Sequence, residues 1–143
     1  MSKPKILVID DNPSDVHLLQ LALGGKNCEF EIEIATDGEA AIQVVLDQSE
    51  ADWIPCVIVL DMHLPKYDGV QVLEKIRQSP GMRYVKVVVT TTSISPSYMN
   101  AIQSFGASYY PKPDDLSEFE ALARHVLDLC RNFKPGLLAT AIF

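Results

Sequence analysis

Strand-like and helix-like segments alternate five times along this chain of 143 residues. Short runs rich in β-branched and aromatic residues are typical of strands, and they occupy residues 5–9, 30–36, 56–60, 85–90 and 108–110. Each run is followed by a segment whose apolar residues recur at helical spacing. Parallel strands need crossover connections, which helices supply. The alternation therefore predicts one parallel sheet with helices on both faces.

The predicted topology is the doubly wound, flavodoxin-like (βα)5 arrangement of the α/β class. Because crossovers are right-handed, a five-stranded sheet of this kind has the order 2-1-3-4-5, and the order reverses between the first and third strands. The runs 5–9 and 56–60 are continuously apolar, as strands covered on both faces are, whereas 30–36 alternates and is expected at an edge. Ligands of such sheets bind beyond the carboxyl ends of the strands, at the point of reversal.

Four of the helices have recognisable start signals. Asn12, Asp37, Asp68 and Ser95 are good N-caps, and prolines follow the first and last of them. The glycine pair at 24–25 and Gly106 are typical of helix ends. The first helix has Val16, Leu19 and Leu23 on one face, the second contains Ala41, Ile42, Val45 and Leu46, and the third carries Val72, Leu73 and Ile76. In the last helix, Leu116, Phe119, Ala123, Val126 and Leu127 are expected to face inward.

Composition argues against several classes of function. The chain has 19 Asp and Glu against 12 Lys and Arg, a net charge of −7, so we expect no nucleic-acid-binding surface. No apolar run reaches the roughly 18 residues of a membrane span, and no signal-peptide core follows the first residues. Cys28, Cys56 and Cys130 lack metal-ligand spacing. We expect Cys56 and Cys130 to be buried thiols, which fits a reducing, cytoplasmic setting.

Three carboxylates are expected to meet where the strand order reverses. Asp10 and Asp11 follow the first predicted strand, and Asp61 follows the third. Like charges at close range disfavour simultaneous ionisation, and a hard divalent cation removes the conflict, since Mg²⁺ prefers carboxylate, carbonyl and water oxygens. On the alternative reading, Asp10 and Asp11 are only a polar loop before the Asn12 cap. The position of Asp61 favours the metal site.

Two further residues are expected at the same edge of the sheet. Thr90 ends the fourth predicted strand, and Lys112 follows the fifth. Threonine often occurs simply because it suits a strand, and a loop lysine is usually a solvated charge. Facing three carboxylates, however, they complete a set consisting of a nucleophilic oxygen, a divalent ion, a hydroxyl and an ammonium. Phosphoryl transfer depends on such positioning and charge neutralisation.

The chain resembles the response-regulator receiver domains of the CheY type over residues 3–131. Four motifs, each at the end of a predicted strand, support the resemblance: "VIDDN" at 8–12, "LDMHLPKYDG" at 60–69, "VVVTT" at 87–91 and "YYPKP" at 109–113. Each motif alone is weak, but all four in this order are highly specific.

The resemblance implies a role for each residue of the site. Asp61 would accept a phosphoryl group from the phosphohistidine of a sensor histidine kinase. Asp11 and Asp61 would bind Mg²⁺ directly, Asp10 would bind it through water, and the backbone carbonyl of His63 would complete the protein ligands. Lys112 would pair with the phosphoryl oxygens.

The resemblance also implies a switch. Thr90 would move toward the phosphoryl group, and Tyr109 would turn inward into the vacated space. The face formed by the fourth helix, the fifth strand and the last helix would then change its affinity for a downstream protein. On this reading the chain is a phosphoacceptor and not an enzyme with a substrate of its own.

The last residues of the sequence allow three expectations. Residues 1–131 would form the receiver domain, and 132–143 an apolar tail after a Pro-Gly break. Because no effector domain follows, output is expected through protein binding, with homodimerisation through the last helix and the tail. The run "VVVTTTS" at 87–93 is similar to that of stand-alone receivers encoded beside phytochrome-type kinases, so a kinase of that type is the expected donor.

Two competing functions stay open at this point. A phosphatase of the haloacid dehalogenase kind also forms an aspartyl phosphate, but it carries a D-x-D motif after the first strand and a cap insertion. Here Asp10 and Asp11 are adjacent. A pseudo-receiver would be a binding scaffold that no longer takes phosphate, and the presence of every acid, threonine and lysine argues against it.

Overall fold

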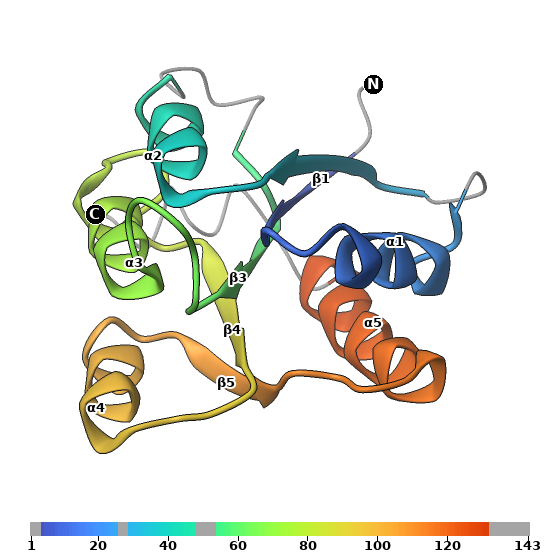
Figure 1. The fold of residues 1–143 in the computed structure, drawn as a ribbon. Helices are drawn as coiled ribbons and strands as arrows, with labels where there is room; N and C mark the ends of the chain where they lie inside the picture. Colours follow the sequence, from blue (N-terminus) through green and yellow to red (C-terminus); the bar gives the residue numbers. More distant parts are fainter. Residues whose placement is uncertain (1–3, 26–28, 48–53, 132–143) are drawn as a thin grey trace.

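A computed structural model describes residues 4–25, 29–47 and 54–131, in which five strands alternate with five helices (Figure 1). The tail at 132–143 and Cys28 lie outside the described residues. The elements are β1 (Lys5–Ile9), α1 (Pro13–Ala22), β2 (Glu31–Ala35), α2 (Gly38–Leu46), β3 (Val57–Asp61), α3 (Gly69–Gln78), β4 (Lys86–Thr91), α4 (Pro96–Ser104), β5 (Ser108–Pro111) and α5 (Leu116–Arg131).

The sheet has the predicted topology. All four strand pairs are parallel, and the order is β2-β1-β3-β4-β5. Helices α1 and α5 lie together on one face, and α2, α3 and α4 lie on the other (Figure 1). Because β1 and β3 are neighbours, their carboxyl ends lie side by side at the point where the order reverses.

Alternate residues of the central strands supply two separate core layers. Ile6 and Val8 of β1 pack toward α1 and α5, whereas Leu7 and Ile9 pack toward α2 and α3. Burial on both faces explains why these strands are continuously apolar in sequence. The strand β2 is only half-buried, which confirms the predicted edge position.

Side-chain caps begin four of the helices as predicted. The side chains of Asn12, Asp37, Asp68 and Ser95 each accept a hydrogen bond from a backbone N–H of the first turn. At α3 the cap is reciprocal, because the Gln71 side chain accepts a hydrogen bond from the Asp68 N–H. These caps fix where each helix starts relative to the strand before it.

One residue predicted to face inward is wrong. Leu116 is 44% exposed. It is the first residue of α5. Leu122 was missed and is 1% exposed in the middle of α5.

Arg77 ties three segments together at the end of α3. Its guanidinium donates hydrogen bonds to the carbonyl oxygens of Arg83 (3.0 Å), Val85 (2.7 Å) and Phe105 (2.6 Å). Burial lowers the pKa of this guanidinium from its usual value. The side chain thereby joins α3 to the start of β4 and to the end of α4.

Replacing Arg77 should therefore destabilise the fold. Arg77→Met keeps most of the aliphatic stem but leaves three carbonyl oxygens without their donor, so we expect a loss of about 2 kcal/mol in unfolding free energy. Urea unfolding followed by circular dichroism measures it. Lys75→Met, which removes a charge from the same helical turn, is the matched control and should change the free energy by less than about 0.5 kcal/mol. Equal losses in both variants would contradict the role given to Arg77.

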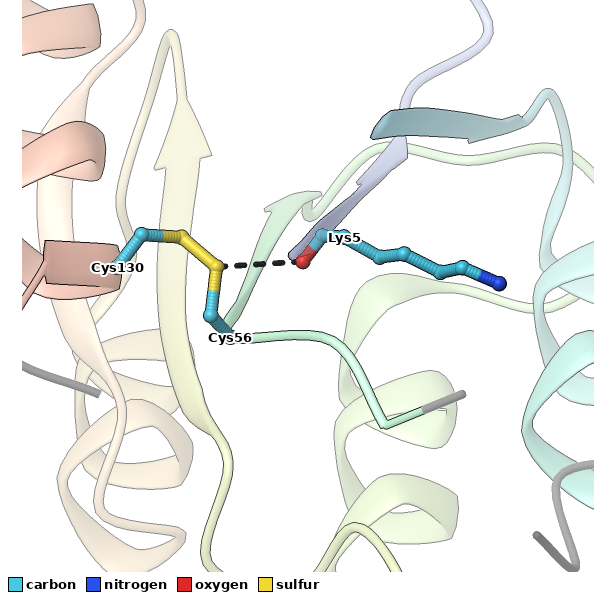
Figure 2. The surroundings of a disulfide bond; sticks show 3 residues. All are labelled: Lys5, Cys56 and Cys130. Atoms are coloured by element: carbon cyan, nitrogen blue, oxygen red, sulfur yellow. Dashed lines mark hydrogen bonds between the residues drawn. A yellow bond between two sulfur atoms is a disulfide. The ribbon is translucent and has the colours of Figure 1, made fainter. Parts of the chain in front are cut away.

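Cys56 and Cys130 are both buried, as predicted, but they are joined by a disulfide and are not free thiols (Figure 2). The bond connects the residue before β3 with the last turn of α5. The packing of α5 along β3 brings the two cysteines together, and their 74-residue separation hid this pairing in the sequence.

Among the helices that the structure describes, none combines the length and the apolar character needed to cross a membrane.

Candidate functional site

The acidic residues meet at the carboxyl ends of β1 and β3. Asp10 and Asp11 follow directly after β1, and Asp61 is the last residue of β3. One carboxylate oxygen of each lies within 4.8 Å of the others. Asp10 and Asp61 are each 7% exposed, and Asp11 is exposed. The structure thus brings together the three carboxylates that were predicted to converge.

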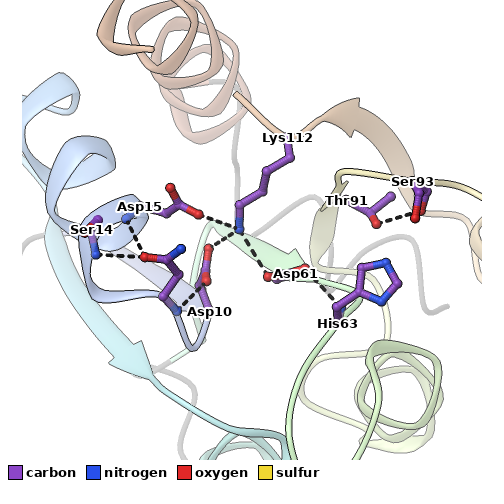
Figure 3. Close-up of polar contacts among 9 residues, drawn as sticks. Asp10, Ser14, Asp15, Asp61, His63, Thr91, Ser93 and Lys112 are labelled. Atoms are coloured by element: carbon purple, nitrogen blue, oxygen red, sulfur yellow. Dashed lines mark hydrogen bonds and ion pairs between the residues drawn. The ribbon is translucent and has the colours of Figure 1, made fainter. Parts of the chain in front are cut away.

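Lys112 lies among these carboxylates (Figure 3). Its backbone N–H donates to the carbonyl oxygen of Thr91 (3.1 Å), which extends the pairing of β5 with β4 and directs the chain over the site. Its Nζ lies 2.5 Å from Oδ2 of Asp10 and 3.1 Å from Oδ2 of Asp61. The Lys112 side chain is only 7% exposed. Lys112 therefore faces the acids as predicted, and it is not a solvated surface lysine.

Burial and neighbouring charges shift two pKa values here. Burial raises the pKa of the Asp10 carboxyl, and hydrogen bonds from Lys112 and from the Asn12 N–H offset only part of that rise. Burial also opposes the charged form of Lys112, but the hydrogen bonds and charges of Asp10 and Asp61 outweigh it and raise the pKa of Lys112. Lys112 is therefore a cation at neutral pH. Its contribution to stability is lost only as the pH rises through the raised lysine value.

Two glycines let the backbone pass close to the loop after β3 and hold this loop against the site. A Cβ on Gly69 would lie 2.5 Å from the Cα of Met62, and a Cβ on Gly38 would lie 2.2 Å from the carbonyl oxygen of Tyr67. Neither distance is compatible with a side chain. The Gly69 N–H donates to the Met62 carbonyl oxygen (3.0 Å). These contacts fix the segment that follows Asp61.

His63 contacts Asp61 through its backbone. The His63 N–H donates to Oδ1 of Asp61 (3.0 Å), so that one oxygen of this carboxylate is held by the loop and the other by Lys112. The His63 ring is exposed and meets the ring of Tyr98 in α4 edge to face, with centroids 5.7 Å apart. The assignment of the His63 carbonyl as a metal ligand stays a prediction.

Thr90 lies on β4, the strand beside β3, and Tyr109 lies on β5, the strand beyond β4. Thr90 is paired with Asp61 in the β3–β4 register and is 2% exposed. Tyr109 is half-buried and is paired with Val89. The fourth strand begins and ends one residue later than predicted. The hydroxyl of Thr91 donates to the carbonyl oxygen of Ser93 (2.8 Å). The switching roles of Thr90 and Tyr109 stay predictions.

Asp15 was missed as a member of the site. Its Oδ2 lies 3.3 Å from Nζ of Lys112, so three carboxylates surround this ammonium (Figure 3). No site role was predicted for Asp15, which is an acidic residue in the first turn of α1. A signal was present in the sequence. The Asn12 cap comes two residues after Asp10, so the first turn of α1 starts next to the site.

Comparison with known proteins agrees with this geometry. A family profile described as "Response regulator receiver domain" matches residues 6–124, most of the chain. The chain belongs to this family. It is thus a CheY-like receiver domain of two-component signalling, a class of domain that interacts with histidine kinases and binds Mg²⁺.

Three similarities place the domain among its relatives. Response regulator Rcp1 of Synechocystis sp. is 39% identical over 90 residues, which cover 62% of this chain and 61% of Rcp1, less than two thirds of it. The structure of the phosphorylated cyanobacterial phytochrome response regulator RcpA has a TM-score of 0.79 at 28% identity, covering 92% of this chain and 96% of RcpA. The structure of the Mn²⁺-bound form of Rcp1 has a TM-score of 0.74 at 31% identity, covering 86% and 91%.

Proposed function

We propose that this receiver domain accepts a phosphoryl group on Asp61 from a histidine kinase, with Mg²⁺ bound beside it, and signals through a protein-binding face that responds to phosphorylation. The observation that carries the proposal is the position of Asp61. It lies beside two further carboxylates and within 3.1 Å of the buried ammonium of Lys112. Such a site can orient a carboxylate nucleophile and neutralise the charge of an incoming phosphoryl group.

The residues present fit a magnesium ion. The oxygens of Asp10, Asp11 and Asp61 are close enough to share one cation, and carboxylates are the ligands that Mg²⁺ prefers. Asp11 and Asp61 would hold the ion directly, Asp10 through water, and the His63 carbonyl would add a backbone oxygen. When bound, the ion supplies positive charge to the phosphoryl oxygens.

The chain's own residues then have distinct tasks in the transfer. A carboxylate oxygen of Asp61 forms the bond to phosphorus while the bond from phosphorus to the kinase imidazole nitrogen breaks, and the imidazole leaves with the electron pair of that bond. The His63 N–H and Lys112 orient the Asp61 carboxylate before the reaction. Lys112 pairs afterwards with the phosphoryl oxygens. Thr90, on the strand beside Asp61, offers a hydroxyl to the same group.

Output is proposed to follow from a two-state change of α4, β5 and α5. Once Thr90 bonds to the phosphoryl group, Tyr109 turns inward and the surface presented to a downstream protein changes. Phosphorylation shifts this equilibrium only as far as its contacts differ between the two states. The domain is proposed to act in the cytoplasm as a phosphoacceptor without a turnover substrate of its own.

Two more specific parts of the proposal concern partners. The similarity to RcpA, described as a phytochrome response regulator, supports a phytochrome-type kinase as the donor. The second part is homodimerisation through α5 and the tail at 132–143. The tail lies outside the described residues.

Replacing Asp11 should weaken magnesium binding. Asp11→Ala removes a proposed direct ligand from an exposed position, so we expect Mg²⁺ affinity to fall at least about tenfold, with the fold unchanged. Calorimetric titration with Mg²⁺ measures the affinity. Asp47→Ala removes a carboxylate from the end of α2, away from the acidic group, and should leave the affinity unchanged. An Asp11→Ala protein that binds Mg²⁺ like the wild type would remove Asp11 from the ligand set.

The proposed function is tested by incubating the full chain with acetyl phosphate and Mg²⁺. Intact-mass measurement should show one added phosphoryl group that hydroxylamine removes, as it does from an acyl phosphate. A chain that stays unmodified, under conditions that label another receiver domain, would be a binding scaffold without phosphoacceptor activity. Sustained hydrolysis of small phosphate esters would instead indicate a phosphatase.

A further inference from the structure

A pair of cysteines lies at the opposite end of the sheet from Asp61. Cys56 directly precedes β3, and Cys130 is the penultimate residue of α5. Since a strand rises about 3.3 Å per residue, Cys56 lies roughly 16 Å from Asp61 along the chain. The phosphoacceptor chemistry proposed above uses neither cysteine.

The surroundings of Cys56 suit both a thiol and a disulfide (Figure 2). The carbonyl oxygen of Lys5 accepts the backbone N–H of Cys56 (2.8 Å) and lies 3.2 Å from its Sγ. In the reduced protein the thiol can donate to this oxygen, and in the oxidised protein the sulfur bonds to Cys130. The Cα atoms of the two cysteines are 5.0 Å apart, a separation that disulfides adopt readily. The thiol and disulfide forms can therefore share the same backbone arrangement.

The position of Cys130 gives the pair a route to solution reagents. Both sulfurs are enclosed, with Cys56 1% and Cys130 5% exposed, so exchange requires a local opening. The last turn of a helix opens at a lower free energy than its centre, and Cys130 lies in that turn. Unwinding this single turn exposes both cysteines while the sheet and the acidic site stay intact.

We propose that Cys56 and Cys130 form a reversible thiol–disulfide site that locks the end of α5 to the sheet when oxidised. The proposal rests on the cytoplasmic setting of the proposed function, because disulfides that form there are mostly transient and redox-responsive. The co-reactant is a low-molecular-weight disulfide of the glutathione class. One cysteine thiolate attacks it and releases one glutathione thiol. The second cysteine then attacks the mixed disulfide and releases another. Two protein thiols and one glutathione disulfide thus become one protein disulfide and two glutathione thiols.

The consequence for signalling follows from where α5 is held. Its start follows the segment that places Lys112 against Asp10 and Asp61, and its end is tied to β3 by the disulfide. Because α5 forms one side of the proposed output face, the oxidised state restricts how far that face moves. The reduced state leaves the last turn held by packing alone.

The test equilibrates the full chain carrying Cys28→Ser in glutathione buffers that run from fully reduced to fully oxidised. Rapid alkylation followed by mass spectrometry measures the fraction of disulfide. We expect a reversible transition between a protein with two free thiols and one with the Cys56–Cys130 bond. Because the bond closes a loop of 74 residues, the oxidised form should have a Tm about 10 °C higher. Hydrogen exchange in the last turn of α5 should be slower in that form.

The variant carrying Cys28→Ser and Cys130→Ser serves as the control, and its Tm should not depend on the glutathione ratio. A disulfide that persists in every buffer would be a permanent structural bond, and the proposal would be wrong. Free thiols or glutathione adducts throughout, or equal Tm values for the two forms, would also overturn it. Acetyl phosphate labelling of both forms separates the two proposals. A domain that exchanges its disulfide but takes no phosphoryl group contradicts only the proposed function.

Discussion

Asp61→Asn should reduce phosphoryl incorporation from acetyl phosphate to background while the fold is kept. The amide has the shape of the carboxylate but lacks its nucleophilic oxygen, so no acyl phosphate forms. One of the carboxylates within 4.8 Å of the others is removed at the same time. Relief of like-charge repulsion should keep the unfolding free energy at or above that of the wild type. Intact-mass measurement and urea unfolding test the two expectations.

Asp68→Asn is the matched control for this variant. Asp68 is a carboxylate in the same loop, but it caps α3, and asparagine caps a helix equally well. This control should be labelled like the wild type. Full labelling of Asp61→Asn would show that Asp61 is not the acceptor. Loss of labelling in both variants would show that the loss is not specific to Asp61.

Lys112→Ala should have the second largest effect. It should lower the unfolding free energy and raise the Mg²⁺ affinity. The buried carboxylates of Asp10 and Asp61 lose their ammonium partner, which should lower the unfolding free energy by about 3 kcal/mol in the absence of divalent ions. Mg²⁺ no longer competes with the ammonium, so its affinity should rise by about tenfold or more. Labelling should persist, but the conformational response should be lost. Hydrogen exchange across α4 and β5, with and without beryllofluoride, measures this response.

Lys66→Ala is the control for the loss of charge. Lys66 is exposed and ion-pairs with Glu39 outside the acidic site, so its removal should leave stability and Mg²⁺ affinity close to wild-type values. If Lys112→Ala responds to beryllofluoride as the wild type does, Lys112 does not connect the site to the output face. If its Mg²⁺ affinity falls, the electrostatic account of the site is wrong.

Local signals made most of the fold predictable. The first strand was predicted with its observed bounds, and four helix starts were located from Asn12, Asp37, Asp68 and Ser95, because a cap is decided by residues within one turn. The strand order followed from alternation and handedness alone. Helix ends were less predictable, since exposure there depends on where neighbouring elements stop, as Leu116 illustrates.

The site was predictable where it depends on strand ends and unpredictable where it depends on helix placement. Asp10, Asp11, Asp61 and Lys112 follow strands of known order, so their convergence was expected. The contact of Asp15 with Lys112 depends on how α1 is rotated over the sheet. The Cys56–Cys130 bond depends on how far α5 extends along β3, and no local pattern encodes this.

The central claim is that Asp61 is the residue that carries the phosphoryl group. Borohydride reduction of the wild-type chain, after incubation with acetyl phosphate and Mg²⁺, converts a phosphorylated aspartate to homoserine, which peptide mass spectrometry locates. We predict that the modification appears at Asp61, and only there among the four acids Asp10, Asp11, Asp15 and Asp61. Modification at Asp10, Asp11 or Asp15, or at no aspartate of the chain, would contradict the account.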